Sequence, residues 1–256
     1  MFAAESSSNG LDGMPEAPAT VEVVGYRLAA IDLNGAAEWL MRAAQQEDRP
    51  RLIVTLNPEI VVRSGTSVAL RSALRHADLT VADGVGLLWA ARRAGHILPG
   101  RVSGIDLVCR AMELGGSSLR VYFLGAGPGV AERAAAKAQE RWGTRVAGFH
   151  HGYFSGEAES EQVISEVRSA APNLLLAGLG EGQEEFLDSN RLALGAKVLV
   201  GVGGTLDVLA GEAQRTPAWT RKLHLEWAWR VGLDRRRWHR IPRLLRFVRL
   251  VRARTP

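Results

Sequence analysis

The stretch 120–138 reads RVYFLGAGPGVAERAAAKA and contains a strand, a glycine loop and the start of a helix in succession. Arg120–Leu124 is an apolar run of strand length that breaks at Gly125, and helical spacing runs from Val130 to Trp142. A buried strand that enters a helix through glycines is typical of an α/β domain. The stretch therefore predicts one strand–helix unit of a sheet that carries helices on its faces.

The same alternation of short apolar runs and helical patterns continues on both sides of this stretch. Further strands are expected at about 21–24, 51–56, 79–82, 145–149, 174–179 and 197–202, and further helices at about 32–46, 58–63, 67–76, 85–93, 106–114, 157–170 and 183–192. Most of these strands are apolar throughout, which indicates that helices cover both faces of the sheet. We expect an α/β fold with a Rossmann-like, largely parallel sheet flanked by helices.

Charge divides the chain into an acidic body and a basic tail. The net formal charge is +5 over 256 residues, but the segment 215–256 holds twelve Arg and one Lys against two acidic residues, a net +11. The first 214 residues therefore carry −6. We expect a disordered leader over residues 1–20, an α/β core over 21–211 and a basic helical appendage over 212–256.

The protein is expected to be cytoplasmic. Its single cysteine, Cys109, excludes an internal disulfide framework. The N-terminal residues lack a basic segment followed by an apolar run, and the longest apolar stretches fall short of the roughly 18–20 residues that a spanning helix needs. We therefore expect neither a signal peptide nor a transmembrane helix.

The loop 125–129 is a candidate site for a phosphate group. Backbone amides at the start of the following helix would face an anion there, and Gly125 and Gly127 would let a ligand approach the backbone closely. The dinucleotide fingerprint is incomplete, because Val130 stands where a third glycine is needed and no acidic residue follows the next strand. A nicotinamide or flavin is therefore disfavoured, and we expect no cofactor. The alternative is a tight turn that only packs the helix on the strand.

Two other strand ends carry polar side chains that suit catalysis. Thr55 and Asn57 lie at the end of the strand at 51–56, and Asp83 follows the strand at 79–82. Ligands of open parallel sheets bind outside the carboxyl ends of the strands, so a carboxylate there is a candidate general base for a hydroxyl group. The alternative is that Asp83 only caps the helix that follows.

Glycine-rich turns also follow the strands at 174–179 and 197–202. Gly203 and Gly204 would allow a ligand close to the backbone, and Gln183 offers a neutral hydrogen-bonding group. We therefore expect the binding site to extend over these two loops.

These loops, in this order, resemble the WecG/TagA/CpsF family of glycosyltransferases. The resemblance runs from about Val21 to Arg240 and rests on the motifs TLNPEIVVRS, RHADLTVADGVGLLWAAR, RVSGIDL, FLGAGPGVAE, HHGYF, GLG followed by QEEF, GVGGTLDVLAG and RTPAWTRKLHLEWAWR. It implies a bacterial, membrane-associated, inverting glycosyltransferase. Such an enzyme moves a sugar, typically of N-acetylmannosamine type, from a UDP-sugar to a polyprenyl-diphosphate-linked sugar in the synthesis of teichoic acid or another surface polysaccharide.

The resemblance also implies roles for individual residues. The family's base falls on Asp83, and its active-site Thr and Asn fall on Thr55 and Asn57. Its Gln-Glu pair falls on 183–184, where the preceding dipeptide is Glu181-Gly182 instead of the usual Pro-Lys type. The residues expected to bind substrate are Gly125, Gly127, His151, Tyr153, Gln183, Glu184, Gly203, Gly204, Arg215, Arg221 and Arg230.

The end of the tail reads IPRLLRFVRLVRAR and predicts an amphipathic helix. Leu244, Phe247, Val248 and Val251 share one side, and the opposite side carries arginines. We expect this helix to hold the protein peripherally on an anionic membrane, at the inner face of the cell membrane. Packing between subunits of a homo-oligomer is one alternative. Nucleic-acid binding is a second one, which the acidic body and the lack of a nucleic-acid-binding fold disfavour.

Arginines nearer the start of the tail bear on the chemistry. Arg215, Arg221 or Arg230 would neutralise the diphosphate of departing UDP through bidentate hydrogen bonds. The Asp-x-Asp pattern that usually holds a metal ion in sugar-nucleotide enzymes is absent from the chain, so we expect metal-independent transfer. The pair His150-His151 is expected in a loop near the donor, without a metal. The alternative reading of the whole chain is a non-catalytic nucleotide- or nucleic-acid-binding protein with a basic tail.

Overall fold

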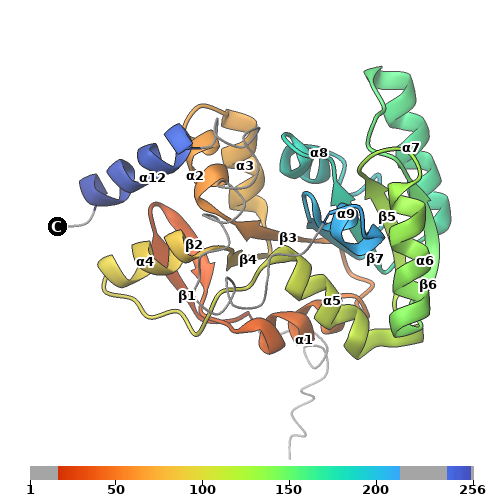
Figure 1. Ribbon diagram of the computed structural model, residues 1–256, viewed down its shortest axis with the longest axis horizontal. Helices are drawn as coiled ribbons and strands as arrows, with labels where there is room; N and C mark the ends of the chain where they lie inside the picture. Colours follow the sequence, from red (N-terminus) through yellow and green to blue (C-terminus); the bar gives the residue numbers. More distant parts are fainter. Residues whose placement is uncertain (1–16, 214–240, 255–256) are drawn as a thin grey trace, which may run out of the picture.

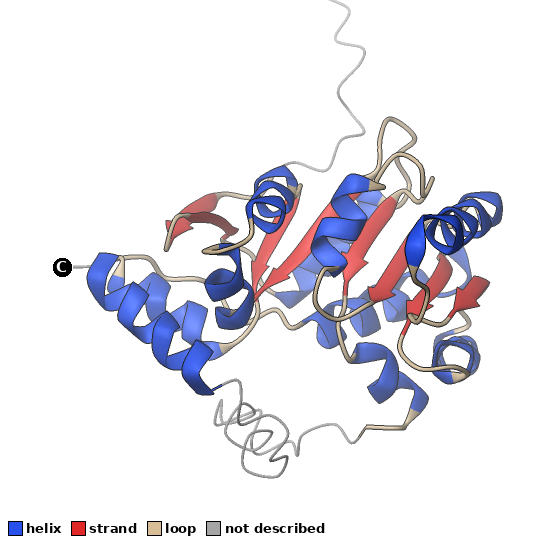
Figure 2. Cartoon of the chain, turned by 90° about the horizontal axis from the view of Figure 1, so that it is seen from above, coloured by secondary structure: helices blue, strands red, loops and turns tan. Residues whose placement is uncertain are grey.

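The fold is built on one parallel sheet with helices on both faces (Figure 1, Figure 2). The computed structural model describes residues 17–213 and 241–254. Its six-stranded sheet has the order β4-β3-β8-β7-β5-β6, and each pair of neighbours is parallel. The strands are β3 (Arg51–Leu56), β4 (Leu79–Ala82), β5 (Arg120–Gly125), β6 (Arg145–His150), β7 (Leu174–Gly178) and β8 (Val198–Gly201). The expected α/β class and parallel sheet are confirmed.

Alternation along the strands separates two hydrophobic clusters. On β3, Ile53 belongs to one cluster, while Leu52 and Val54 belong to the other. The first cluster joins the sheet to the helices α1 (Leu33–Ala43), α5 (Gly104–Gly115), α6 (Val130–Trp142) and α9 (Thr205–Ala210). The second joins it to α2 (Pro58–Ser64), α3 (Val68–His76), α4 (Val85–Arg93), α7 (Gly156–Ala170) and α8 (Gln183–Ser189). A short 3-10 turn, η1 (Gly116–Ser118), follows α5.

The N-terminal part of the core is a two-stranded antiparallel hairpin where the sequence predicts a single strand. Its strands are β1 (Thr20–Val23) and β2 (Tyr26–Ala29). The turn residues Val24 and Gly25 have φ angles of 48° and 86°, as a tight hairpin with two positive φ angles requires. Strand β1 also begins inside the segment 1–20 that was expected to be disordered.

The C-terminal helix α12 (Ile241–Arg254) packs on the body of the protein beside α2 (Figure 1). Phe247 and Val251 are fully buried and belong to the cluster of α2 and α4. The apolar side that was expected to face lipid is therefore covered by protein, because α2 and α4 leave an apolar surface that needs burial. Arg246, Arg249 and Arg252 on the opposite side stay exposed.

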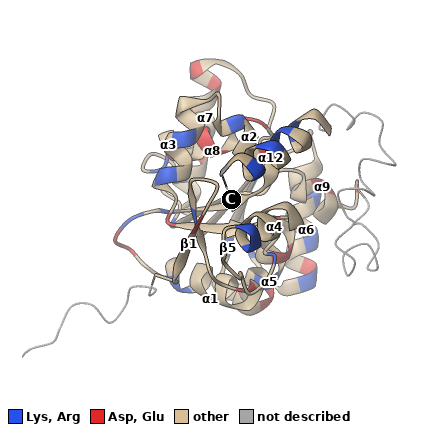
Figure 3. Ribbon diagram, turned by 90° about the vertical axis from the view of Figure 1, so that its left-hand side faces the viewer, with Lys and Arg blue, Asp and Glu red and all other residues tan. Residues whose placement is uncertain are grey.

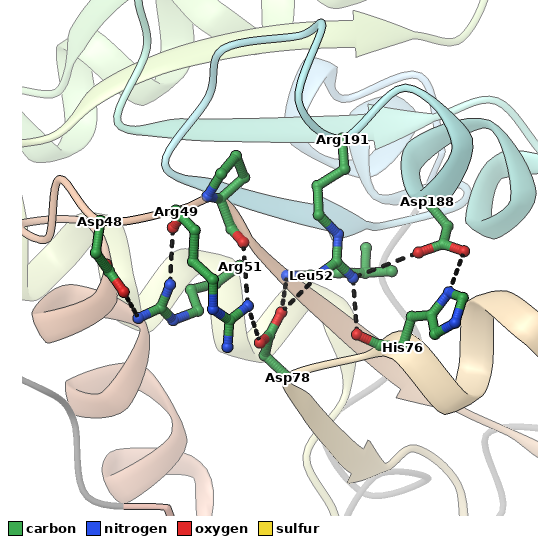
Figure 4. A network of polar contacts seen from close by, with 9 residues as sticks. Asp48, Arg49, Arg51, Leu52, His76, Asp78, Asp188 and Arg191 are labelled. Carbon is green, nitrogen blue, oxygen red and sulfur yellow. Dashed lines mark hydrogen bonds and ion pairs between the residues drawn. The ribbon is translucent and has the colours of Figure 1, made fainter.

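A polar network fixes the amino end of β3 (Figure 4). The carboxylate of Asp78 accepts hydrogen bonds from the Leu52 amide at 2.8 Å and from Arg191 at 3.1 Å, and it pairs with Arg49 at 2.5 Å. The buried Arg51 pairs with Asp48 at 2.7 Å. These contacts set the position of the strand whose other end carries Thr55 and Asn57.

The topology opens the sheet at the carboxyl ends of β3 and β8. These strands are neighbours, but the chain leaves β3 towards α2 and leaves β8 towards α9, which belong to opposite clusters. Such a switch point is where open α/β sheets bind ligands.

Candidate active site

The pairing of β3 with β4 brings Asn57 and Asp83 next to each other. Leu56 pairs with Ala82 as the last residue of each strand, so the two polar residues follow at the same level. The amide of Asp83 donates to the Leu56 carbonyl at 2.7 Å, which continues the ladder one step beyond the sheet. The structure thus joins two of the three predicted catalytic residues at one edge.

Thr55 lies within β3, two residues before Asn57, and faces the end of β8 and the start of α5. It is 8% exposed, and its hydroxyl lies 3.5 Å from the Gly201 carbonyl at the end of β8. A Cβ atom on Gly104 would approach the same hydroxyl to 3.3 Å. Thr55 therefore lies buried where β3, the end of β8 and the start of α5 come together.

Asn57 has a structural role besides the predicted one. Its Oδ1 accepts from the amides of Glu59 and Ile60, both at 3.0 Å, and so caps α2. Among the described residues, none accepts a hydrogen bond from its Nδ2 group. The amide hydrogens of Asn57 are the part of the side chain that can serve a ligand.

Asp83 does not occupy the cap position of the helix that follows. The N-cap residue of α4 is Gly84, with a φ of 96° and no side-chain hydrogen bond. The alternative role as a simple helix cap is therefore not supported. The carboxylate stands instead at the junction of β4 with α4, at the edge where the strands end.

Gln183 and Glu184 link the loops after β7 and β8. Gln183 donates from Nε2 to Glu184 Oε1 at 2.8 Å, and its Oε1 accepts from the Gly203 amide at 3.2 Å. Both side chains are nearly fully buried, and Glu184 Oε2 lacks a hydrogen-bond partner in the described part of the chain. Burial raises the pKa of Glu184, against a smaller opposing effect of its hydrogen bond from Gln183. The pair sits under Gly201, where a Cβ atom would come within 2.8 Å of Gln183 Nε2.

Glycines allow the loops after β5, β7 and β8 to touch backbone to backbone. Gly125 has a φ of 134°, and a Cβ atom there would overlap the Gly178 carbonyl. A Cβ atom on Gly178 would come within 2.7 Å of the Gly203 carbonyl. By contrast, a Cβ atom on Gly127 or Gly204 would meet only ordinary contacts at 3.7 Å. Packing accounts for Gly125, while Gly127 and Gly204 remain available for the approach of a ligand.

Comparison with known proteins shows the family of the chain. The family model described as "Glycosyl transferase WecG/TagA/CpsF family" matches residues 21–255. The chain belongs to the WecG/TagA/CpsF glycosyltransferase family. The match includes the six-stranded sheet, all of the loops described above and the whole of α12.

Two relatives of this glycosyltransferase carry a specific name. It is similar to an N-acetylglucosaminyldiphosphoundecaprenol N-acetyl-beta-D-mannosaminyltransferase of Staphylococcus aureus (strain MRSA252), with 35% identity over 203 residues that cover 78% of each chain. The protein of the same name from strain NCTC 8325 / PS 47 is 34% identical over the same share of each chain.

In this glycosyltransferase, His151 and Tyr153 lie at the opposite edge of the sheet from Asp83. Both follow β6, the edge strand five spacings from β4, or roughly 24 Å across the sheet at about 4.8 Å per strand. His150 Nδ1 lies 2.7 Å from the His151 carbonyl, and Tyr153 is 75% exposed. A Cβ atom on Gly152 would lie 3.1 Å from the Cα atom of Gly125, so this loop borders the glycine loop after β5.

The start of α5 adds residues to which the sequence pattern alone assigns no role. Ser103 caps α5 and lies 2.5 Å from the Asp106 carboxylate, and Arg101 lies 3.6 Å from the same carboxylate. The amide of Val102 donates to the Ala82 carbonyl at 2.9 Å, directly before Asp83. The Ser-x-x-Asp spacing of a capping box could have located this helix start. Arg101, next to Val102, brings a positive charge near the end of β4.

Three predicted tail residues, Arg215, Arg221 and Arg230, lie outside the described residues. Within residues 17–213 and 241–254, no cluster of three His, Cys, Asp or Glu side chains is arranged to hold a metal ion. In the same part of the glycosyltransferase, none of the helices is both long and apolar enough to cross a bilayer.

Proposed function

We propose that this glycosyltransferase moves an N-acetylmannosamine-type sugar from a UDP-sugar to N-acetylglucosamine carried on a polyprenyl diphosphate, with inversion at the anomeric carbon. Family membership and the name of the relatives support the sugar and the lipid-linked acceptor. The observation that carries the proposal is the placement of Thr55, Asn57 and Asp83 at the carboxyl ends of the neighbouring strands β3 and β4, beside the switch point between β3 and β8. A pathway of teichoic-acid type would use the product.

In this scheme Asp83 is the general base. Its carboxylate takes the proton of an acceptor hydroxyl as the oxygen attacks the anomeric carbon of the donor. The bond between that carbon and the diphosphate oxygen breaks, and UDP leaves with the electron pair. A single displacement from the opposite side inverts the anomeric carbon. Thr55 and the amide hydrogens of Asn57 position the sugar hydroxyls.

The departing diphosphate would lie over the glycine loops. Gly127, Gly203 and Gly204 leave room for a phosphate near backbone amides. Arginines then neutralise the developing charge, for which Arg215, Arg221 and Arg230 are the proposed residues. Arg101, at the start of α5, is a fourth cation near the acceptor side.

Peripheral binding to an anionic membrane fits the charge of one side of the molecule. Figure 3 shows basic residues on α12 and on the neighbouring α4. Arg92 and Arg93 of α4 and Arg246, Arg249 and Arg252 of α12 are exposed, and Ile97, in the loop after α4, is 85% exposed. A basic surface with apolar residues suits contact with anionic headgroups, where a lipid-linked acceptor lies.

A transfer assay tests the proposal. The purified full chain is mixed with a short-chain prenyl-diphosphate-N-acetylglucosamine and, in turn, with UDP-N-acetylmannosamine, UDP-N-acetylglucosamine and UDP-glucose. Mass spectrometry is expected to detect one added N-acetylhexosamine from the first donor, at an undiminished rate in excess EDTA. A protein that is stabilised by nucleotides but transfers no sugar would support the non-catalytic alternative. Loss of transfer in EDTA, restored by a divalent cation, would refute the arginine-based scheme.

A further inference from the structure

Helix α12 contacts segments next to three of the proposed site residues, Asn57, Asp83 and Gln183. It packs on α2, whose cap is Asn57. Its Phe247 ring reaches Gly86, three residues after Asp83, where a Cβ atom would lie 3.3 Å from the ring. Its Arg243 reaches Glu181, two residues before Gln183. One helix, distant in sequence, therefore contacts the segments that carry Asn57, Asp83 and Gln183.

Arg243 makes the polar part of this contact. Its Nη1 lies 2.5 Å from Glu59 Oε1 in the first turn of α2 and 2.6 Å from Glu181 Oε1 in the loop between β7 and α8. The carboxylates of Glu181 and Glu59 raise the pKa of Arg243 further above its already high ordinary value. The guanidinium is thus a permanent cation held between the carboxylate of a helix and the carboxylate of a loop.

This contact lies among charged side chains of α2 and of the β7–α8 region. Glu59 lies in α2, whereas Glu181 and Glu185 lie in the β7–α8 region, and Arg63 of α2 also lies 3.8 Å from both Glu181 and Glu185. Arg243 and Glu59 are only 31% and 27% exposed, so water screens their attraction less than it screens a fully exposed pair.

We propose that Arg243 is a positioning residue that fixes the α2 cap relative to the Gln183 loop, and that α12 thereby acts as a brace for the active site. The proposal rests on the proposed function for its effect on turnover. It assigns to α12 a role that needs no contact with substrate: the helix sets the distance between Asn57, which would hold a sugar, and the Gly203 loop, which Gln183 anchors. Displacement of this kind by about 1 Å can lower a rate by as much as 10²-fold.

A charge-swap series tests the brace. R243E places three carboxylates together and is expected to lower kcat by about 10- to 100-fold, with a smaller change in KM for the donor. The double variant E181R/R243E restores a cation between two carboxylates, since the arginine at position 181 then lies between Glu59 and the new glutamate. It is expected to recover most of kcat. R120E is the matched control, because Arg120 is an exposed residue at the amino end of β5.

Hydrogen exchange gives a readout that does not depend on transfer. In R243E, amide exchange is expected to accelerate in segments 57–64 and 179–186, and to return towards wild-type rates in E181R/R243E. Thermal unfolding of each variant checks that the sheet is intact.

Three results would overturn the inference. The first is wild-type kcat in R243E, and the second is a loss of kcat that E181R/R243E does not recover. The third is unchanged exchange in both segments of R243E, which decides the matter even if the wild-type chain transfers none of the sugars tested and the proposed function itself fails.

Discussion

At the scale of single residues, the site depends on side chains that do two jobs. Asn57 uses its carbonyl oxygen to cap α2, and its amide hydrogens are the part that we propose binds a ligand. Gln183 uses both ends of its carboxamide to join Glu184 to the Gly203 loop. The positions of Thr55, Asn57 and Asp83 at strand ends could be predicted from the sequence, because apolar runs stop there. The bond from Gln183 to Gly203 could not, because it joins two loops whose approach depends on the packing of β7 against β8.

The two jobs of Asn57 can be separated by substitution. Asp caps a helix about as well as Asn, whereas Ala loses about 1 kcal/mol of stability at such a position. N57D is therefore expected to unfold within about 0.5 kcal/mol of the wild type in urea and to lose most of its transfer rate. N57A is expected to lose both stability and transfer rate. Full activity in N57D would remove the amide hydrogens from substrate binding.

The buried carboxyl of Glu184 predicts a pH dependence of stability. Because burial raises its pKa in the folded state, the unfolded chain ionises this group at lower pH, and ionisation favours unfolding as pH rises. E184Q keeps an acceptor for Gln183 but has no charge. Its free energy of unfolding relative to the wild type is expected to increase from about pH 4 to about pH 8.

Urea titrations at both pH values measure this difference. E140Q makes the same chemical change on the exposed side of α6 and serves as the control. A relative stability of E184Q that falls with rising pH would mean that Glu184 is stabilised as a carboxylate in the fold.

At the scale of elements, local signals set the strands and helices, and tertiary contacts set their use. The bounds of β3, β4 and α6 agree with the sequence prediction, since Asn57-Pro58, Asp83-Gly84 and the left-handed Gly143 mark their ends. Strand β2 was missed because only the turn at Val24-Gly25 separates it from β1. The amphipathic pattern of α12 predicts a helix but not its partner, which turns out to be α2 and α4. A pattern defines an apolar face, while the shape of the rest of the molecule decides what covers it.

The glycine loop after β5 allows packing to be tested separately from binding. G125A would strain a φ of 134° and overlap the Gly178 carbonyl, so we expect a loss of at least about 1–3 kcal/mol. G127A has room for its methyl group and an ordinary φ, so its stability is expected to stay within about 1 kcal/mol of the wild type. Calorimetric titration is expected to show weaker binding of UDP to G127A. Unchanged UDP affinity in G127A would leave the loop with a packing role alone.

At the scale of the whole molecule, the uneven charge of the sequence corresponds to an acidic body and a basic outer face of α12. The acidic body contains the sheet and the proposed site, and the described part of the basic tail covers α2 and α4 with its apolar side. Arg246, Arg249 and Arg252 of α12 are exposed, and Figure 3 shows basic positions along this helix. The helix thus has an inner face that contacts the supports of the site and an outer face of positive charge.

The outward arginines predict salt-dependent binding to membranes. The full chain is expected to sediment with vesicles that contain anionic lipid and much less with neutral ones, and binding should weaken as salt is raised. The triple variant R246Q/R249Q/R252Q is expected to bind less while unfolding at the wild-type temperature, because these side chains are exposed. Equal binding to neutral and anionic vesicles would contradict an electrostatic contact.

The turnover of D83N tests the central claim most directly. Asn is close in size to Asp but cannot take a proton from an acceptor hydroxyl, so transfer from UDP-N-acetylmannosamine should fall by about 10²- to 10⁴-fold. D32N, which keeps the cap of α1 outside the strand-end loops, controls for loss of a carboxylate. The account predicts that D83N retains the wild-type unfolding temperature and UDP affinity but not the rate. Near-normal turnover in a folded D83N protein would contradict it.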